Sequence, residues 1–221
     1  MKRELRKTAD GSNTLYVPDL DEHYHSFHGA LQEAKHVFIQ NGLLNQKKTS
    51  LRVLEVGFGT GLNALLTACA AFRLGYTIDY VGIEAYPVPT ELMEKMDYAC
   101  LLEDNNAALF YEQIIHSKWS TTNSIHAKFQ LTKLEERIED TLIGKKFDLI
   151  YFDAFGPRVQ NEIWNVSILK KMYSFLNFDG ELVTYCAKGQ FKRDLKSFGF
   201  EVFSLNGPPG KREMVRSRKI K

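Results

Sequence analysis

A turn with three alternating glycines constrains the fold of this chain more than any other feature of its sequence. Residues 51–56 form a short apolar run that predicts a buried strand, and residues 62–74 predict an apolar helix. Gly57, Gly59 and Gly61 stand between them. Glycine lets the backbone turn sharply and lets a ligand approach closely, and the N–H groups of a helix start attract polar ligands. The turn therefore predicts a ligand site between a strand and a helix of a doubly wound sheet.

The rest of the chain alternates between strand and helix patterns, which predicts an α/β fold with a mostly parallel sheet. We expect a Rossmann-like, mixed seven-stranded sheet whose last strand is antiparallel, because the last two strands are joined by only a short loop. The predicted strands are residues 51–56, 77–84, 125–131, 147–152, 181–186, 200–205 and 211–215. The predicted helices after the glycine turn are residues 62–74, 90–118 with a break near 103–106, 134–143, 163–176 and 190–198.

A small extension is expected before the first core strand. Residues 3–20 resemble a hairpin with a turn at residues 10–13, and residues 30–39 show helical spacing of apolar side chains. We therefore divide the chain into an N-terminal hairpin, lid and helix extension over residues 1–45 and a main domain over residues 46–221.

The spacing of the glycines and two acidic residues favours S-adenosylmethionine as the ligand. A dinucleotide fold has the pattern G-x-G-x-x-G, whereas here position 62 is leucine. Glu55 precedes the first glycine by two residues and would repel a pyrophosphate, but it can meet the ammonium of a methionine moiety. Glu84 ends the second predicted strand, where an acid can accept both ribose hydroxyls. Together these residues predict a class I methyltransferase.

Asp153 follows the apolar strand at residues 147–152, which is predicted to lie beside the glycine-turn strand. Its carboxylate would border the same crevice, near the transferable methyl group. There it can hold a substrate amine in line with the methyl–sulfur bond and stabilise the charge that forms on nitrogen. A turn role for this Asp before Pro157 is the alternative.

A histidine-rich segment, with His23, His25 and His28, superficially resembles a zinc-binding run. Phe27 stands where such a run has aspartate, and no further ligands are evident. Because a catalytic zinc needs at least three converging ligands, we expect no metal and interpret the segment as a lid over the cofactor.

The basic residues gather near the end of the sequence. From Lys188 to Lys221, ten Lys or Arg outnumber three acidic residues, which gives a net charge of +7 against −5 elsewhere. This distribution favours a docking face for a polyanion, with a solubilising tail as the alternative. No apolar run is long enough to span a bilayer and no signal peptide is evident. Three widely spaced cysteines without a Cys-x-x-Cys pair argue against a disulfide framework, so we expect a cytoplasmic protein.

Several segments resemble the methyltransferase domain of the bifunctional bacterial enzyme MnmC, which makes 5-methylaminomethyl-2-thiouridine at the tRNA wobble position, and its stand-alone relatives (MnmD). The most specific matches are His23-Tyr24-His25-Ser26-Phe27-His28-Gly29-Ala30 and Gly207-Pro208-Pro209-Gly210-Lys211-Arg212-Glu213-Met214. Further matches are Glu33, residues 36–39, 54–63, 151–155 and 182–189, so the resemblance covers nearly the whole chain.

The resemblance implies methylation of the exocyclic amine of 5-aminomethyl-2-thiouridine in tRNA. In that case Asp153 matches the catalytic aspartate. Glu55, Gly57, Gly59, Gly61 and Asn63 match the cofactor loop, and Glu84 matches the ribose acid. Tyr24 and His25 fall in the closing segment. The fused oxidase half is absent, so other enzymes would supply the aminomethyl precursor. The run Gln190-Phe191-Lys192-Arg193 departs mildly from the expected pattern and keeps two positive charges.

A tRNA substrate gives the basic segment and the aromatic residues specific roles. Tyr24 and Phe155 can stack on the extruded base. The residues expected to contact tRNA phosphates are Lys188, Lys192, Arg193, Lys211 and Arg212. Three alternatives remain: an N-methyltransferase for a small-molecule or protein amine, a nicotinamide oxidoreductase, and a non-catalytic tRNA-binding module.

Overall fold

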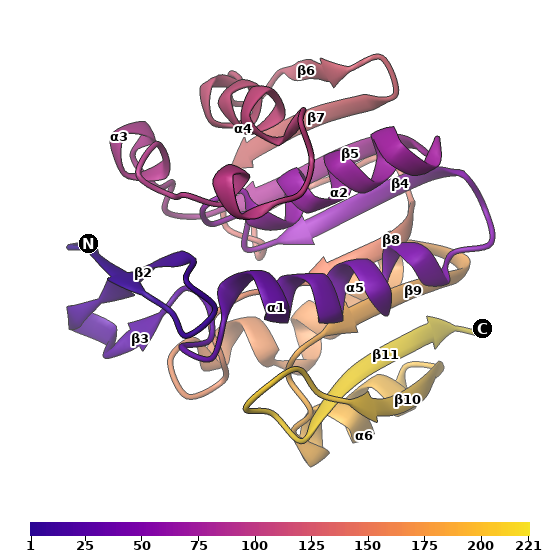
Figure 1. The fold of residues 1–221 in the computed structure, drawn as a ribbon. Helices are drawn as coiled ribbons and strands as arrows, with labels where there is room; N and C mark the ends of the chain where they lie inside the picture. Colours follow the sequence, from indigo (N-terminus) through magenta and orange to yellow (C-terminus); the bar gives the residue numbers. More distant parts are fainter.

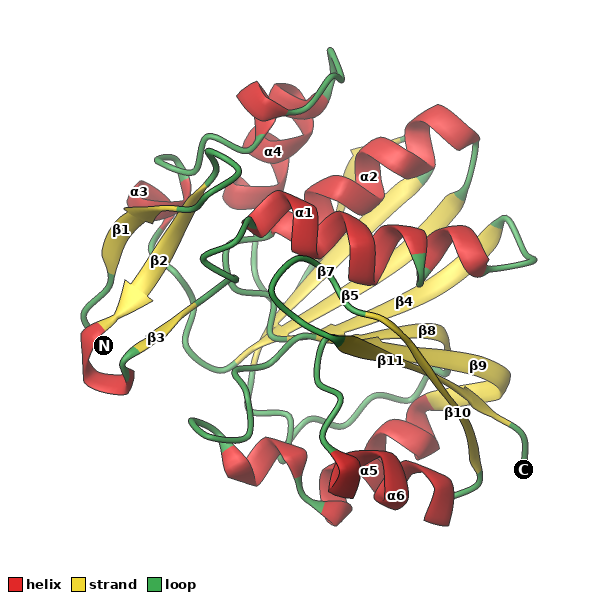
Figure 2. Cartoon of the chain, turned by 60° about the horizontal axis from the view of Figure 1, so that its bottom comes forward, coloured by secondary structure: helices red, strands yellow, loops and turns green.

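An eight-stranded sheet forms the centre of the molecule, and helices cover both of its faces (Figures 1 and 2). This arrangement comes from a computed structural model that describes all residues, 1–221. The strands lie in the order β10-β11-β9-β8-β4-β5-β7-β6. In chain order they are β4 (Ser50–Val56), β5 (Thr77–Glu84), β6 (Thr122–His126), β7 (Phe129–Glu135), β8 (Phe147–Phe152), β9 (Leu176–Thr184), β10 (Phe200–Asn206) and β11 (Glu213–Lys219).

The five central strands, from β7 to β9, run parallel, and β11 is antiparallel to both of its neighbours, as predicted. After β4 the chain continues on one side of that strand, through β5 to β7, and β8 then returns to its other side. A crevice forms outside the carboxyl ends of the strands where the order reverses in this way. The reversal at β4 and β8 therefore places the glycine turn and Asp153 at the same crevice.

The helices form one layer on each face of the sheet. The α-helices are α1 (Ala30–Ala34), α2 (Leu62–Leu74), α3 (Thr90–Met93), α4 (Ala107–His116), α5 (Val166–Phe175) and α6 (Gly189–Ser197). A π-helix, η2 (Lys35–Gln40), continues α1, and single 3-10 turns occur at η1 (Pro18–Leu20), η3 (Leu43–Asn45), η4 (Ala99–Leu101) and η5 (Asn161–Trp164). Helices α1, α2 and α4 bury apolar side chains in one core cluster, and α5 and α6 in another. The helices are short, and none has the combined length and apolar character that crossing a membrane requires.

The sheet has one strand more than predicted, because residues 122–135 form an antiparallel hairpin instead of a single strand. Its turn contains neither glycine nor proline. The backbone N–H of Lys128 instead donates to the ring of His126 at 3.2 Å. Such a local contact between a side chain and the backbone leaves no strong signal in the sequence.

The predicted helix at residues 134–143 is wrong. Leu134 and Glu135 continue β7, where they pair with Ile83 and Glu84 of β5. Residues 136–143 form a loop, and Leu142 in that loop is 91% exposed. The apolar residues that suggested helical spacing therefore do not share a buried face. The segment over residues 90–118 is also more broken than predicted, since it contains α3, η4 and α4 as separate pieces.

A small three-stranded sheet precedes the main sheet and lies near the carboxyl ends of its parallel strands (Figure 1). It contains β1 (Glu4–Lys7), β2 (Asn13–Val17) and β3 (Glu22–His23). The predicted hairpin with its turn at residues 10–13 corresponds to β1 and β2. The division of the chain at residue 45 remains a prediction. Helix η2 belongs to the predicted extension, yet its buried side chains pack into the core of the main sheet.

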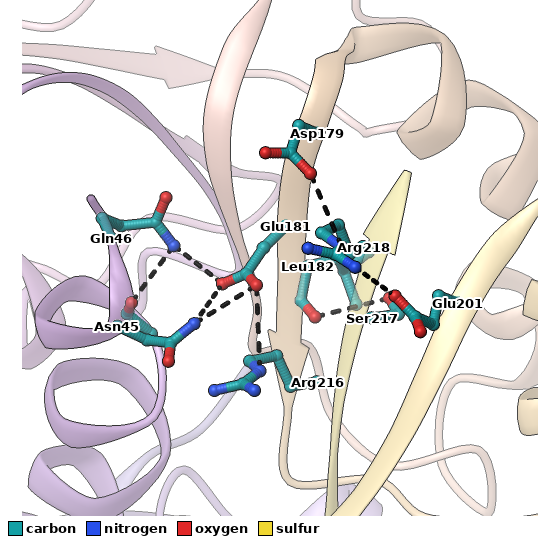
Figure 3. Close-up of polar contacts among 10 residues, drawn as sticks. Asn45, Gln46, Asp179, Glu181, Leu182, Glu201, Arg216, Ser217 and Arg218 are labelled. Atoms are coloured by element: carbon teal, nitrogen blue, oxygen red, sulfur yellow. Dashed lines mark hydrogen bonds and ion pairs between the residues drawn. The ribbon is translucent and has the colours of Figure 1, made fainter. Parts of the chain in front are cut away.

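Polar contacts hold β11 against β9 at the opposite end of the sheet (Figure 3). The buried carboxylate of Glu181 on β9 accepts hydrogen bonds from Asn45 at 3.0 Å and Gln46 at 2.8 Å. Arg216 on β11 lies 3.8 Å from the same carboxylate. These contacts connect the end of the N-terminal extension to the last strand through Glu181 on β9.

Candidate active site

The glycine turn after β4 requires glycine at its first position. Gly57 has a φ of +92°, and a Cβ there would lie 2.5 Å from the backbone carbonyl oxygen of Asp153. The chain segments that follow β4 and β8 thus touch at Gly57, and a side chain would force them apart. This contact fixes the distance between the glycine turn and Asp153.

A cleft of about 970 Å³ opens at this turn. Asp153 lines it together with five of the six residues predicted to bind the cofactor, which are Glu55, Gly57, Gly59, Asn63 and Glu84. Gly61 does not line the cleft. It precedes α2 with a φ of +76°, and a Cβ there would meet the side chains of Ile114 and Phe58. Its position is explained by packing at the start of the helix.

The side-chain amide of Asn63 connects Glu55 and Asp153, two of the acidic residues that line the cleft. Its Nδ2 donates to Glu55 Oε1 at 2.8 Å and to Asp153 Oδ2 at 2.8 Å. The other carboxylate oxygen of Glu55 accepts a hydrogen bond from the Tyr80 hydroxyl at 2.8 Å. Glu55 and Tyr80 come from the neighbouring strands β4 and β5, and Asn63 from the first turn of α2. The two carboxyl groups are therefore held in fixed positions on one wall of the cleft.

Burial makes both acids hold their protons more strongly than free carboxyl groups do. It raises the pKa of Glu55 well above its usual value, and the nearby charge of Asp153 raises it further. Burial likewise raises the pKa of Asp153, and the charge of Glu33 adds to that effect. A positively charged group in the cleft would relieve both effects.

Glu84 holds the glycine turn at the opposite side of the cleft. Its Oε2 accepts a hydrogen bond from the backbone N–H of Gly59 at 2.9 Å, and its Oε1 accepts one from the N–H of Tyr86 at 3.0 Å. Each carboxylate oxygen can accept a further hydrogen bond. Glu84 can therefore bind hydroxyl groups while it supports the turn.

A second cavity, of about 990 Å³, lies on the other side of Asp153. It shares five residues with the first cleft, namely Tyr24, His25, Asp153, Ala154 and Phe155. These residues form the boundary between the two spaces, and Asp153 supplies the carboxyl group at that boundary. A molecule in the first cleft and another in the second can thus meet beside this carboxyl group.

The lid segment contributes Tyr24 and His25 to this boundary. A Cβ on Gly59 would lie 3.2 Å from the Tyr24 ring, so the ring covers the glycine turn. The Tyr24 hydroxyl accepts a hydrogen bond from Arg3 at 2.9 Å, and its ring meets Phe155 edge-on at 5.1 Å. Burial lowers the pKa of His25 to about 4, so that ring is neutral near pH 7.

Lys211 lies inside the second cavity instead of on an exposed basic face. Its Nζ forms an ion pair with the buried carboxylate of Glu33 on α1 and lies 3.8 Å from the centre of the Tyr185 ring. Glu33 also accepts a hydrogen bond from the backbone N–H of Ser26 at 2.8 Å. The ammonium of Lys211 therefore faces the cavity that Asp153 also lines.

The other four residues predicted to contact tRNA lie at the surface around α6 and the β10–β11 loop. Lys188, Arg193 and Arg212 are exposed. Lys192 is less available, because its Nζ pairs with Glu213 at 2.8 Å. These placements leave three of the five predicted basic residues free to reach a large anion.

Sequence reasoning gave no role to Glu33 or Tyr185, which both line the second cavity. Glu33 carried a usable signal, since it stands on the apolar face of its helix between Ala30 and Val37. Tyr185 carried none, because a tyrosine at the end of a buried strand usually belongs to the core.

The three histidines of the lid segment serve different contacts. His25 bonds to Thr14 at 3.2 Å, His28 packs against Gly210, and His23 pairs with Tyr16 across β2 and β3. No cluster of three or more His, Cys, Asp or Glu side chains in the structure is arranged to hold a metal ion.

Comparison with known proteins identifies the family. Residues 103–220, more than half of the chain, match the model of a family described as S-adenosyl-L-methionine-dependent methyltransferase. The chain belongs to this methyltransferase family. Its cofactor is therefore S-adenosyl-L-methionine, as the glycine spacing predicts.

Curated relatives of this methyltransferase are larger proteins. The chain is 27% identical, over 96% of its length, to the tRNA 5-methylaminomethyl-2-thiouridine biosynthesis bifunctional protein MnmC of Pseudoalteromonas atlantica. It is 29% identical, over 94% of its length, to the protein of the same name in Paraburkholderia phymatum. The chain spans about a third of the length of these relatives, 33% and 34% respectively.

A solved structure confirms the fold. The crystal structure of MnmC2 from Aquifex aeolicus matches this chain with a TM-score of 0.77 and 21% identity, over 100% of this chain and 71% of that one. The predicted Rossmann-like methyltransferase fold is thus confirmed, with β6 as an additional edge strand.

The residues of the first cleft fit the cofactor of the family. S-adenosyl-L-methionine carries an ammonium, a sulfonium and two ribose hydroxyls. The cleft offers the carboxylates of Glu55 and Glu84, and Asn63 Oδ1 is a buried acceptor that has no partner within the protein. Buried acceptors are normally satisfied, so this oxygen suits a donor of the cofactor.

Proposed function

We propose that this methyltransferase converts 5-aminomethyl-2-thiouridine to 5-methylaminomethyl-2-thiouridine at the wobble position of tRNA. The observation that carries the proposal is the position of Asp153 on the boundary between the cofactor cleft and a second cavity. The names of the MnmC relatives support the choice of substrate.

In the first cleft, Glu55 and Asn63 would hold the amino-acid end of the cofactor and Glu84 the ribose. Gly57 and Gly59 leave room for the cofactor beside the turn, and Gly61 starts α2. When bound, S-adenosylmethionine supplies an electrophilic methyl group. These residues would fix its position relative to Asp153, so that little motion is needed before transfer.

Asp153 would accept a hydrogen bond from the substrate amine and aim its lone pair at the methyl group. Burial raises the pKa of this carboxyl group, which makes it a better proton acceptor than an exposed carboxylate. Asn63 fixes one of its oxygens at 2.8 Å, which leaves the other free for the amine. The carboxylate also stabilises the positive charge that forms on nitrogen during transfer.

The second cavity would hold the modified base after it leaves the anticodon stack. Tyr24, His25 and Phe155 separate this cavity from the cofactor cleft and can contact the base. Lys211 adds a cation to the same cavity and would donate to an oxygen of the uracil ring. Its role in the proposal therefore changes from a phosphate contact to a base contact.

The exposed cations Lys188, Arg193 and Arg212 would contact tRNA phosphates, with Lys192 as a weaker contributor because of its pairing with Glu213. We propose that other enzymes supply the aminomethyl-uridine precursor. A tRNA substrate also favours a cytoplasmic location.

Mass spectrometry of tRNA nucleosides tests the proposal. The purified chain is incubated with labelled S-adenosylmethionine and tRNA that carries the aminomethyl precursor. We expect the label in 5-methylaminomethyl-2-thiouridine, and Asp153→Ala should abolish this product.

A label found in another nucleoside, or the absence of any labelled nucleoside, would contradict the proposed substrate. Transfer to a small amine with no dependence on salt concentration would then favour a small-molecule methyltransferase, because a tRNA substrate makes binding strongly salt-dependent.

A further inference from the structure

Three ring-bearing side chains, two on the N-terminal sheet and one in the lid segment that follows it, form a row that starts at the second cavity and continues outward. We call Tyr16, His23 and Phe27 the aromatic ladder. The rings of Tyr16 and His23 have their centres 4.8 Å apart, and those of His23 and Phe27 are 6.5 Å apart. Both His23 and Phe27 line the second cavity. The ladder is therefore continuous with the proposed site of the target base.

Phe27 is the most exposed member of the ladder. It is 60% exposed, although it lies in a segment whose neighbours His25 and Ser26 are tied to the protein by hydrogen bonds. The outer end of the ladder carries a cation, since the Arg6 guanidinium lies 5.5 Å from the centre of the Tyr16 ring. A row of rings with an arginine at its end can accept flat aromatic groups.

Charge alone does not explain this surface. The basic side chains of Arg6 and Lys7 on β1 are accompanied by Asp19, Asp21 and Glu22 on the adjoining turn and strand. The hydroxyl of Tyr16 also donates to Asp21 at 2.7 Å. A partner of this surface is therefore recognised by its ring faces more than by its phosphates.

We propose that the aromatic ladder is a stacking platform for a nucleotide next to the target uridine, in the single-stranded loop of the RNA substrate. This inference rests on the proposed function and extends it from the base that reacts to its neighbour. When the target base enters the second cavity, its neighbours lose a stacking partner. Phe27 and His23, at the mouth of the same cavity, can replace that partner.

The test compares Phe27→Ala with Phe178→Ala. Phe178 is a matched control because it is 72% exposed, lies on β9 and lines a different cavity, which Lys47 and Lys48 also line. Steady-state methylation is measured on a stem-loop RNA that carries the aminomethyl uridine and on the isolated nucleoside. We expect Phe27→Ala to raise KM for the stem-loop by about 5- to 150-fold and to leave kcat nearly unchanged. Phe27→Tyr should keep KM near the wild-type value. The KM for the isolated nucleoside, which has no neighbouring nucleotide to stack, should rise much less in Phe27→Ala than the KM for the stem-loop.

Binding of the same stem-loop to the protein loaded with S-adenosylhomocysteine separates this inference from the proposed function. If the wild type binds the RNA without methylating it, the proposed substrate is wrong, and a weaker affinity of Phe27→Ala still supports the ladder. If Phe27→Ala matches Phe178→Ala in both KM and affinity, the ladder is overturned while the proposed function stands. Absence of any binding by the wild type overturns both.

Discussion

At the scale of single residues, the site depends on a buried acid that is held in place by neutral partners. Glu55 accepts hydrogen bonds from Asn63 and Tyr80, both at 2.8 Å, and has no cation beside it. Neutral donors offset only part of the cost of burying a charge. The folded protein therefore binds the proton of Glu55 more tightly than the unfolded chain does, and this difference makes its stability depend on pH.

The sign of that dependence follows from the raised pKa. Below the ordinary pKa of about 4.5, Glu55 is protonated in both states; as pH rises above it, the unfolded chain loses the proton first, and folding stability falls. Glu55→Gln removes this loss, because its amide oxygen can accept from Asn63 and its NH2 group can donate to the hydroxyl oxygen of Tyr80. We expect the stability of the variant relative to wild type to increase as pH rises from 4.5, as measured by urea unfolding. Glu112→Gln, on the exposed face of α4, is the control, and identical pH profiles for all three proteins would contradict this account.

Gly57 gives a second prediction at this scale. Gly57→Ala combines a left-handed φ with a Cβ 2.5 Å from the carbonyl oxygen of Asp153, whereas Gly11→Ala has a similar φ of +84° and open space. Both variants should lose about 1–3 kcal/mol of stability from backbone strain. Only Gly57→Ala should also weaken S-adenosylhomocysteine binding, by more than about tenfold, or 1.4 kcal/mol. Calorimetry that finds equal affinities for the two variants would show that the contact with Asp153 does not shape the cleft.

At the scale of elements, the loop between β10 and β11 is fastened to α1 and η2. Lys211 pairs with Glu33, and the backbone carbonyl of Asn206 lies 2.8 Å from the ring Nε2 of His36. The specific run Gly207-Pro208-Pro209-Gly210 lies between these two contacts. Its conformation brings the lysine of the loop into the second cavity, which explains why a segment near the chain end belongs to the site.

A double-mutant cycle tests this fastening. Lys211→Met leaves the carboxylate of Glu33 buried without its cation, which should cost about 1–3 kcal/mol of unfolding free energy. Adding Glu33→Gln should recover most of that loss, because the amide needs no cation and can still accept the hydrogen bond from Ser26. Urea unfolding of the four proteins gives the coupling energy. Strictly additive effects would contradict a direct pair.

The elements that the sequence predicted well are those with strong local patterns. Residues 62–74 and 147–152 have the predicted bounds, because a long apolar helix and a buried strand each have a clear periodicity. The β6–β7 hairpin was missed because its turn depends on the side chain of His126. The predicted helix at residues 134–143 was wrong because pairing with β5 keeps the first two of these residues in strand β7.

Within the candidate site, the residues that follow from a local pattern were predicted, and those that depend on contacts between distant segments were not. Glu55, Glu84 and Asp153 each follow from a position at a strand end, so the sequence places them at one edge of the sheet. Lys211 was assigned to an exposed face, because its partner Glu33 is 178 residues away and no local pattern joins them. Contacts between distant segments of this kind are visible only in the folded chain.

At the scale of the whole molecule, the proposed RNA surface extends from the aromatic ladder across the second cavity to the cations around α6. Substituting one exposed cation should reduce the dependence of RNA affinity on salt by about one unit of log–log slope. We expect this result for Arg212→Ala, with Lys118→Ala, an exposed residue next to the opposite edge strand β6, as the control. Equal slopes for the two variants, from affinities measured over a range of salt concentrations, would place the RNA elsewhere.

The proposed mechanism requires Asp153 to act at the boundary between the cofactor cleft and the substrate cavity. Asp153→Asn tests it most directly, because asparagine keeps the shape of the side chain and removes its ability to accept a proton. With the variant, we expect S-adenosylmethionine affinity within about threefold of wild type, or 0.7 kcal/mol, and a single-turnover rate of methyl transfer that is lower by about 10²–10⁴. A variant that binds the cofactor normally and transfers the methyl group at the wild-type rate would contradict the claim.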